Sequence, residues 1–130
     1  MATQWVQGTL DPPRLSDAVL VEAIVAMFAH KSADIFARQI SALLARPDPT
    51  PVLANIRVPA LVVCGRADSW SPLSQHQEIA ALMPDGPAVE VIEHAGHMST
   101  MDQPQAVAAA LLGWLRLPLQ PGAGTATSPG

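Results

Sequence analysis

The stretch RVPALVVCGRADSWSP, residues 57–72, decides the fold that this sequence predicts. Within it, residues 60–65 form a continuous apolar run that is rich in valine and ends in glycine. Such a run is typical of a short strand buried on both faces, as in a parallel sheet flanked by helices. Ser71 as the cap and Pro72 at the first helical position then predict a helix that extends to about Met83.

A second strand and a last helix follow along the chain. The run AVEVI, residues 88–92, has the composition of a strand, and a helix is predicted to begin near Pro104. Strand, helix, strand and helix in this order indicate a right-handed crossover unit with two parallel strands. The fold class is therefore α/β. The last helix places four apolar residues on one face: Val107, Leu111, Trp114 and Leu115.

The first third of the chain predicts helices instead of strands. Ser16 is expected to cap a helix over residues 17–29, and a second helix is expected to run to about Leu44. Residues 46–59 hold four prolines and read as a connector with one helical turn at Thr50. The second helix carries apolar side chains at the spacing of a buried stripe: Phe36, Ile40, Leu43 and Leu44.

Composition narrows the classes of protein to consider. The chain has 130 residues, of which 49% are hydrophobic and 14% charged, enough to bury the core of one domain. A net charge of −4 gives no electrostatic reason to expect nucleic acid or an anionic membrane as partner. The single cysteine, Cys64, excludes an internal disulfide and fits a reducing cytoplasm. No signal peptide is recognisable, and the longest apolar stretch, residues 18–29, is too short to span a bilayer.

Two loops follow the predicted strands, GRADSW (65–70) and HAGHMST (94–100). Because the carboxyl ends of parallel strands meet at one edge of a sheet, we expect Asp68 and His97 to lie close together. A carboxylate beside an imidazole fixes its tautomer and stabilises the imidazolium that forms when the ring takes a proton. Gly65 is expected to let the chain leave the strand sharply, and Gly96 to permit a tight turn.

Other interpretations of these residues remain open. Asp68 could brace the turn into the following helix, and His97 could be an ordinary turn histidine. His94, His97 and Asp102 could be offered as metal ligands, but they fall across a turn and have no evident fourth partner. Cys64 lies inside the predicted strand, where a cysteine is usually a small buried hydrophobe.

The two loop motifs resemble the carboxy-terminal part of the α/β-hydrolase superfamily. The stretch at 57–72 is similar to the strand and acid loop of that family, and AGHMSTMDQP (95–104) is similar to its histidine loop and final helix. The resemblance covers about residues 50–117, and residues 15–46 resemble the lid helices in position and amphipathic character. It implies that Asp68 is the acid of a catalytic triad and His97 its general base. No metal or organic cofactor is implied.

Trp70 and Met98 flank the proposed acid and base. They are candidates for lining an apolar acyl pocket, or for ordinary core or lid contacts. The resemblance thus divides the chain into a loop, a lid-like helical segment with connector, an α/β-hydrolase segment and a flexible tail. Their ranges are 1–14, 15–57, 58–118 and 119–130.

The sequence departs from the family pattern at the nucleophile. The family places it upstream of the acid on a G-x-S-x-G elbow, whereas Gly8 is the only glycine before Gly65. The expectation is a protein that hydrolyses an ester, lactone or similar acyl bond of a small molecule, with the nucleophile-bearing half absent from this chain. The alternative is a non-catalytic remnant that dimerises or binds a complementary amino-terminal half.

Overall fold

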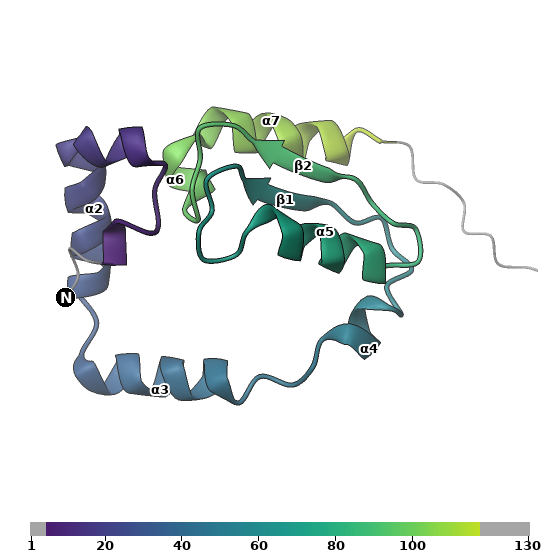
Figure 1. The fold of residues 1–130 in the computed structure, drawn as a ribbon, viewed down its shortest axis with the longest axis horizontal. Helices are drawn as coiled ribbons and strands as arrows, with labels where there is room; N and C mark the ends of the chain where they lie inside the picture. The colour runs from purple at the N-terminus through teal and green to yellow at the C-terminus, as the bar shows by residue number, and fades with distance from the viewer. Residues whose placement is uncertain (1–4, 118–130) are drawn as a thin grey trace, which may run out of the picture.

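The structure is a computed structural model that describes residues 5–117 (Figure 1). The tail predicted over residues 119–130 lies outside the described residues. None of the described helices is long and apolar enough to cross a membrane. The elements follow one another as η1 (Pro12–Ser16, a 3-10 helix), α2 (Ala18–Ala29), α3 (Ala33–Leu44), α4 (Thr50–Leu53), β1 (Val62–Gly65), α5 (Leu73–Leu82), β2 (Val89–Ile92), α6 (Ser99–Asp102) and α7 (Pro104–Leu115).

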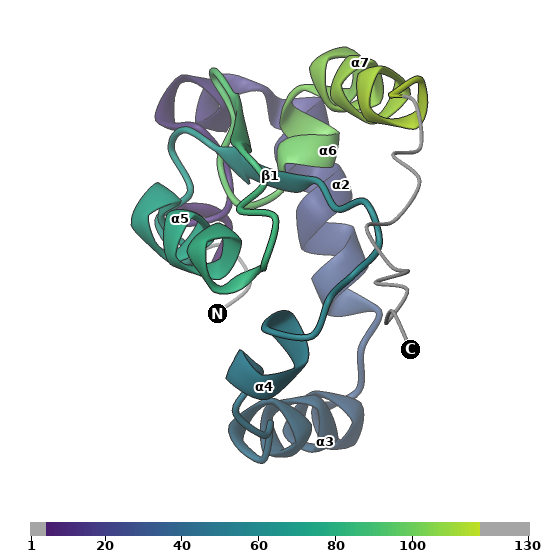
Figure 2. The ribbon, with the colours of Figure 1, turned by 90° about the vertical axis from the view of Figure 1, so that its right-hand side faces the viewer.

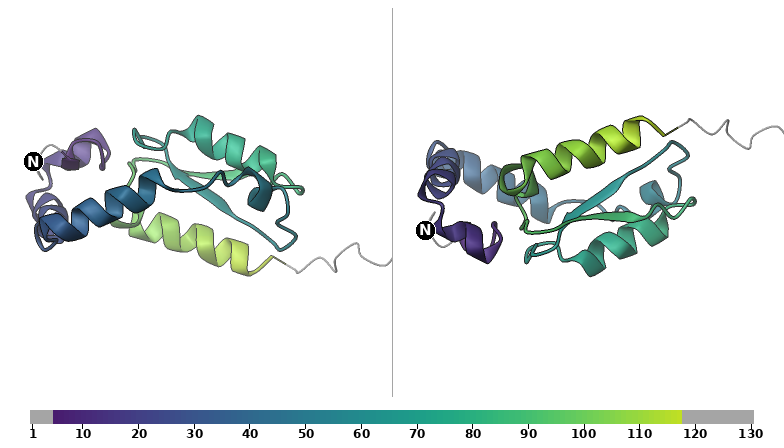
Figure 3. Two further views of the ribbon diagram at one scale, coloured as in Figure 1. Left: turned by 90° about the horizontal axis from the view of Figure 1, so that it is seen from below. Right: turned by 90° about the horizontal axis from the view of Figure 1, so that it is seen from above.

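The sheet consists of the two predicted strands in parallel, which confirms the α/β fold class. Val62 lies opposite Val89 and Gly65 opposite Ile92, so both strands end at the same edge. Figure 3 shows the sheet lying between α5 and α7, one helix on each face. In Figure 1 both arrows point toward the side of the molecule that holds η1 and α2. The loops after the strands therefore meet the amino-terminal segment.

Two small apolar clusters hold this arrangement together. One contains Ile92, Ala95 and Val107 and joins β2 to α7. The other contains Val6, Leu10 and Ile24, with Met98 and Met101 packed against it. This second cluster connects the amino-terminal segment and α2 to α6, which Figure 2 shows beside α2. The histidine loop thus lies between the two cores.

Two predicted helix caps are wrong. The N-cap of α2 is Asp17, whose carboxylate accepts a hydrogen bond from the Leu20 amide at 3.1 Å. Ser16 belongs to η1 instead, where its hydroxyl donates to the Pro13 carbonyl. Helix α5 begins after Pro72 with no side-chain cap, and Ser71 lies one residue before the cap position, where its amide donates to Asp68.

The apolar stripe predicted to be buried on α3 is exposed among the described residues. No residue of α3 is buried, and the Leu44 side chain lies mostly in solvent (82%). Figure 1 shows the reason: α3 lies apart from the sheet and is joined to β1 through α4. On α7 only Val107 is buried, and Leu115 is exposed, since a sheet of two strands covers a narrow part of the helix.

Candidate active site

Asp68 and His97 face each other across the carboxyl edge of the sheet. Nδ1 of His97 lies 3.1 Å from one oxygen of Asp68 and 3.0 Å from the other. The Asp68 side chain is buried (6% exposed), whereas the His97 ring is partly open to solvent (38% exposed). A buried carboxylate that binds Nδ1–H holds an imidazole in the tautomer whose Nε2 can accept a proton.

The same carboxylate also braces the turn that carries it. One oxygen of Asp68 accepts hydrogen bonds from the backbone amides of Trp70, at 3.0 Å, and Ser71, at 2.9 Å. These bonds fix the turn into α5 and orient the carboxylate toward His97. Bracing the turn and pairing with the histidine were separate interpretations of Asp68, and the structure shows both contacts.

Gly65 and Gly96 allow the acid loop, the histidine loop and the amino-terminal segment to pack closely. A Cβ at Gly65 would collide with the backbone carbonyls of Ala95 and Gly96, and a Cβ at Gly96 would lie 2.6 Å from the Leu10 backbone. Neither glycine has a positive φ. Both glycines are therefore required by the close approach of three backbones and not by a left-handed conformation.

The histidine loop is strained and tied at several points. His94 has a φ of 56°, which is uncommon for a residue with a side chain. Its carbonyl accepts a hydrogen bond from the side-chain amide of Gln103 at 3.0 Å. One residue further, the Ala95 carbonyl accepts from the Ala67 amide at 2.8 Å, which joins the histidine loop to the acid loop. The strain is thus held by bonds on both sides of the turn.

The amino-terminal segment contacts both loops, which the sequence did not indicate. The Thr9 carbonyl accepts a hydrogen bond from the Met98 amide at 2.9 Å, directly after His97. The Gly8 carbonyl accepts one from the Ser69 hydroxyl at 3.0 Å, directly after Asp68. No periodicity or motif in residues 1–14 signals these contacts, because they use backbone carbonyls and depend on the tertiary fold.

Trp70 lies against the His97 ring. The centroids of the two rings are 5.0 Å apart at a tilt of 37°. Trp70 also contacts Trp5 edge to face at 5.3 Å, and Trp5 contacts Phe36 of α3 at 5.7 Å. Met98 instead packs against the cluster of Val6, Leu10 and Ile24. An aromatic series thus connects the His97 ring to α3.

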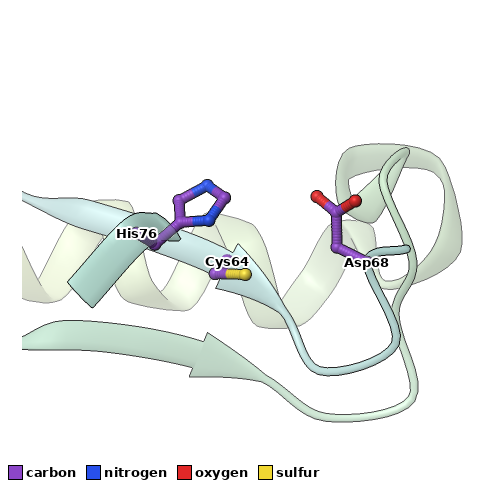
Figure 4. Close-up of side chains that lie close together, drawn as sticks. All are labelled: Cys64, Asp68 and His76. Carbon is purple, nitrogen blue, oxygen red and sulfur yellow. The ribbon is translucent and has the colours of Figure 1, made fainter. Parts of the chain in front are cut away.

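Among the described residues, one group of three has potential metal-ligand atoms that all lie within 4.8 Å of one another. It consists of Cys64, Asp68 and His76 (Figure 4). Each already has a protein partner: the thiol donates to the Gly65 carbonyl at 3.2 Å, and Nδ1 of His76 lies 3.3 Å from the Pro72 carbonyl. Burial raises the pKa of the Cys64 thiol, and the nearby charge of Asp68 raises it further. The thiol is therefore neutral near pH 7, as a small buried side chain is expected to be.

The alternative metal set of His94, His97 and Asp102 is not brought together among the described residues. His94 extends into solvent, with its Nδ1 4.0 Å from a carboxylate oxygen of Asp11. Asp102 is buried and accepts the amides of Asp11 and Gly96. The three side chains point to different neighbours, so this arrangement does not form the proposed ligand cluster.

One ion pair spans the residues that follow the two strands. Arg66 and Glu93 form a two-pronged contact, with nitrogen–oxygen distances of 2.6, 3.1 and 3.2 Å. Their hydrogen bonding raises the pKa of Arg66 and lowers the pKa of Glu93. Both side chains are exposed, so water and salt weaken the pair and it contributes little to stability.

Comparison with known proteins places these features in one family. The sequence profile described as alpha/beta hydrolase family matches residues 2–110. The carbamate hydrolase candidate RutD of Serratia proteamaculans is 31% identical over 99 residues, which are 75% of this chain and 36% of that protein. This chain therefore spans about a third of the length of that relative.

Solved structures agree with the sequence comparison. A thermophilic esterase from Thermogutta terrifontis superposes with a TM-score of 0.82 at 28% identity, over 88% of this chain and 42% of the esterase. Est816, an enzyme that degrades N-acyl homoserine lactones, superposes with a TM-score of 0.68 at 23% identity, over 85% of this chain and 45% of Est816. The likeness to Est816 concerns the fold alone. On the fold and on the match to the family profile, this chain belongs to the alpha/beta hydrolase family.

Proposed function

We propose that this chain supplies the acid and the base of an acyl-bond hydrolase, with His97 as general base and Asp68 as the residue that orients it. The observation that carries the proposal is the contact of Nδ1 of His97 with both oxygens of the buried Asp68. Both contacts use Nδ1, which leaves Nε2 as the ring nitrogen that accepts a proton. The partly open ring gives Nε2 access to a reacting group.

The reaction balances with a hydroxyl nucleophile. Its oxygen forms a bond to the acyl carbon while its proton passes to Nε2 of His97. The bond from the acyl carbon to the leaving alcohol then breaks, and the alcohol takes the proton from Nε2. Water repeats both proton transfers and releases the acid. Throughout, the Asp68 carboxylate stabilises the positively charged ring.

The nucleophile is proposed to come from residues outside this chain, because the sequence has no glycine-flanked elbow before Asp68. The matched esterase and the RutD relative are each more than twice as long as the matched part of this chain, which leaves room for such an elbow in a complementary half. The proposed substrates are small esters first, because one matched structure is an esterase, with carbamates and lactones as related acyl bonds.

A second candidate function is binding without catalysis. The two-stranded sheet has an unpaired edge on β1 among the described residues, and apolar side chains of α3 and α7 are exposed. An unpaired edge and exposed apolar surface favour association with another chain. Both features also fit docking of the complementary half, so the hydrolase proposal accounts for them as well.

The test joins this chain to a nucleophile-bearing half. The chimera carries the amino-terminal part of the Thermogutta esterase, up to its matched region, followed by this chain, and it is assayed with p-nitrophenyl butyrate after circular dichroism has shown that it folds. We expect turnover that the His97→Ala chimera loses, while this chain alone shows no turnover above its own His97→Ala variant. Equal turnover by both folded chimeras would overturn the role of His97.

A further inference from the structure

The buried carboxylate of Asp102 has no part in the reaction proposed above. Asp102 is the last residue of α6, is 3% exposed, and lies 5 residues after His97 in the sequence. One of its oxygens accepts two backbone amides, from Gly96 at 2.7 Å and from Asp11 at 3.1 Å. Amide bonds to a carboxylate are stronger than bonds between neutral groups. A charged group is therefore buried where it ties two distant backbones together.

The second oxygen of Asp102 shows that this carboxylate is not placed for packing alone. It is buried without a hydrogen-bond partner, and so is Nε of Arg14 at 3.7 Å from it. Burying a carboxylate that is only partly satisfied costs free energy. An alanine or leucine at this position would avoid that cost. The two amide bonds, together with the attraction of the nearby Arg14 charge, offset this cost.

One amide bond acts on the residue next to His97, and the other acts on the amino-terminal segment that contacts the same loop. Gly96 precedes His97 directly, so the bond from its amide fixes the peptide unit through which the imidazole is attached. The Asp11 bond holds the amino-terminal segment, whose Thr9 carbonyl accepts the amide of Met98 on the other side of His97. The residue before His97 is thus bonded to Asp102 directly, and the residue after it is bonded to the segment that Asp102 holds.

Steric packing at Gly96 makes the same arrangement tight. The Gly96 Cα faces the backbone of Leu10 and Asp11, where even a methyl group would lie within 2.9 Å of the Asp11 nitrogen. The missing side chain at Gly96 lets the two segments approach closely, and the Asp102 carboxylate accepts an amide from each. The distance from Nδ1 of His97 to Asp68 therefore depends on a loop whose position Asp102 sets.

We propose that Asp102 is the positioning residue of His97: by accepting the amides of Gly96 and Asp11, it holds the imidazole at hydrogen-bond distance from Asp68. This inference rests on the proposed function, which gives the position of His97 its purpose. Asp102 itself touches neither the imidazole nor a reacting atom, so its effect is on the placement and the tautomer of the His97 ring.

The experiment uses the purified chain and two nuclear magnetic resonance readouts. The first is the exchange rate of the Gly96 amide in the unchanged chain, which we expect to be slower than that of an exposed loop amide such as the Asp85 amide. The second is the tautomer of His97, read from its ring ¹⁵N shifts in Asp102→Ala and Asp102→Asn. An asparagine oxygen can accept the same two amides, whereas alanine can accept neither.

In Asp102→Ala we expect Gly96 exchange to accelerate about ten- to a hundredfold, as for the loss of a bond to a charged acceptor, and the Nδ1–H tautomer of His97 to give way to a mixture. Asp102→Asn is expected to retain the tautomer, and Asp85→Asn, on an exposed turn, serves as the matched control. An unchanged His97 tautomer in folded Asp102→Ala would overturn the proposal.

Where Asp102→Ala does not fold, the unchanged chain still decides: exchange of the Gly96 amide as fast as that of the exposed Asp85 amide would overturn the proposal. Failure of the Asp102 proposal can also be distinguished from failure of the proposed function. If Asp102→Ala shifts the tautomer but the chimera shows no turnover dependent on His97, Asp102 positions the ring and the hydrolase proposal is wrong. If the chimera is active and the tautomer does not move, only the role of Asp102 is wrong.

Discussion

Asp68 and His97 are 29 residues apart in the sequence, yet both oxygens of the carboxylate lie within 3.1 Å of one ring nitrogen. The parallel pairing of β1 and β2 brings the two loops to one edge of the sheet. Backbone bonds then fix each loop: Asp68 accepts two amides of its own turn, and the histidine loop is tied to Ala67. The geometry therefore follows from the sheet first and from loop bonds second.

Removing the Asp68 carboxylate should destabilise the chain as well as free the imidazole. Asp68→Ala leaves the amides of Trp70 and Ser71 without their acceptor, and these amides are partly buried. We expect the free energy of unfolding to fall by about 1.5–3 kcal/mol, measured by urea denaturation followed by circular dichroism. Asp85→Ala, on an exposed turn, is the control and should change it by less than about 0.5 kcal/mol. Equal effects of the two substitutions would contradict the bracing role.

The two loop glycines should not tolerate a methyl group. Gly65→Ala and Gly96→Ala each place a Cβ against backbone that cannot rotate away, so each should lower the free energy of unfolding by about 1–3 kcal/mol or prevent folding. Gly113→Ala is the matched control, because its Cβ on the exposed face of α7 would meet nothing within 4 Å. It should stabilise the helix by about 0.5–1 kcal/mol. The three variants are compared with the unchanged chain by thermal denaturation. If Gly96→Ala were as stable as Gly113→Ala, the packing described at Gly96 would be wrong.

The contact between Trp70 and His97 should be visible in fluorescence. At a centroid distance of 5.0 Å, an imidazolium is attracted to the indole face and quenches its emission. Emission excited in the tryptophan band should therefore fall when acid protonates the imidazole. The fall should be absent in His97→Gln and in Trp70→Phe, in which Trp5 and Trp114 still emit. A fall of the same size in Trp70→Phe would place the quenched indole elsewhere.

Stability should decline at alkaline pH because of Cys64. Burial raises the pKa of this thiol in the folded chain, so the unfolded chain ionises first. The contribution is fully present below the pKa of an unfolded thiol, about 8.5, and is lost as the pH rises through the raised pKa of the folded thiol. Urea midpoints measured from about pH 7 to about pH 10 should fall more steeply for the unchanged chain than for Cys64→Ala. Parallel profiles would contradict this assignment.

The sequence carried enough information for the sheet, because short apolar runs ending at Gly65 and after Ile92 are local patterns. It also indicated Asp68 and His97, since loops at the ends of adjacent parallel strands meet. What it could not give was the role of residues 8–11. These residues contact Ser69, Met98 and Asp102 through their own backbone groups. Every residue type carries such groups, so the sequence does not reveal these contacts.

Two further predictions failed for reasons of tertiary context. The apolar side chains of α3 are spaced for burial, but the described elements cover them only in part, through the contact of Phe36 with Trp5. Ser16 and Ser71 have the chemistry of caps, but each cap position falls one residue later in the chain. Asp17 caps α2, and Pro72, which has no side-chain acceptor, precedes α5. Spacing alone does not decide which of two neighbouring residues occupies the cap position.

The measurement that tests the central claim most directly is the tautomer of His97 in the unchanged chain and in Asp68→Asn, read from the ring ¹⁵N shifts at neutral pH. With Asp68 present we expect Nδ1 to carry the proton and Nε2 to be free, as a general base requires. In Asp68→Asn, the side-chain NH₂ faces Nδ1 and should move the proton to Nε2. A proton on Nε2 in the unchanged chain, or the same tautomer in both, would contradict the claim that Asp68 prepares His97 as a base.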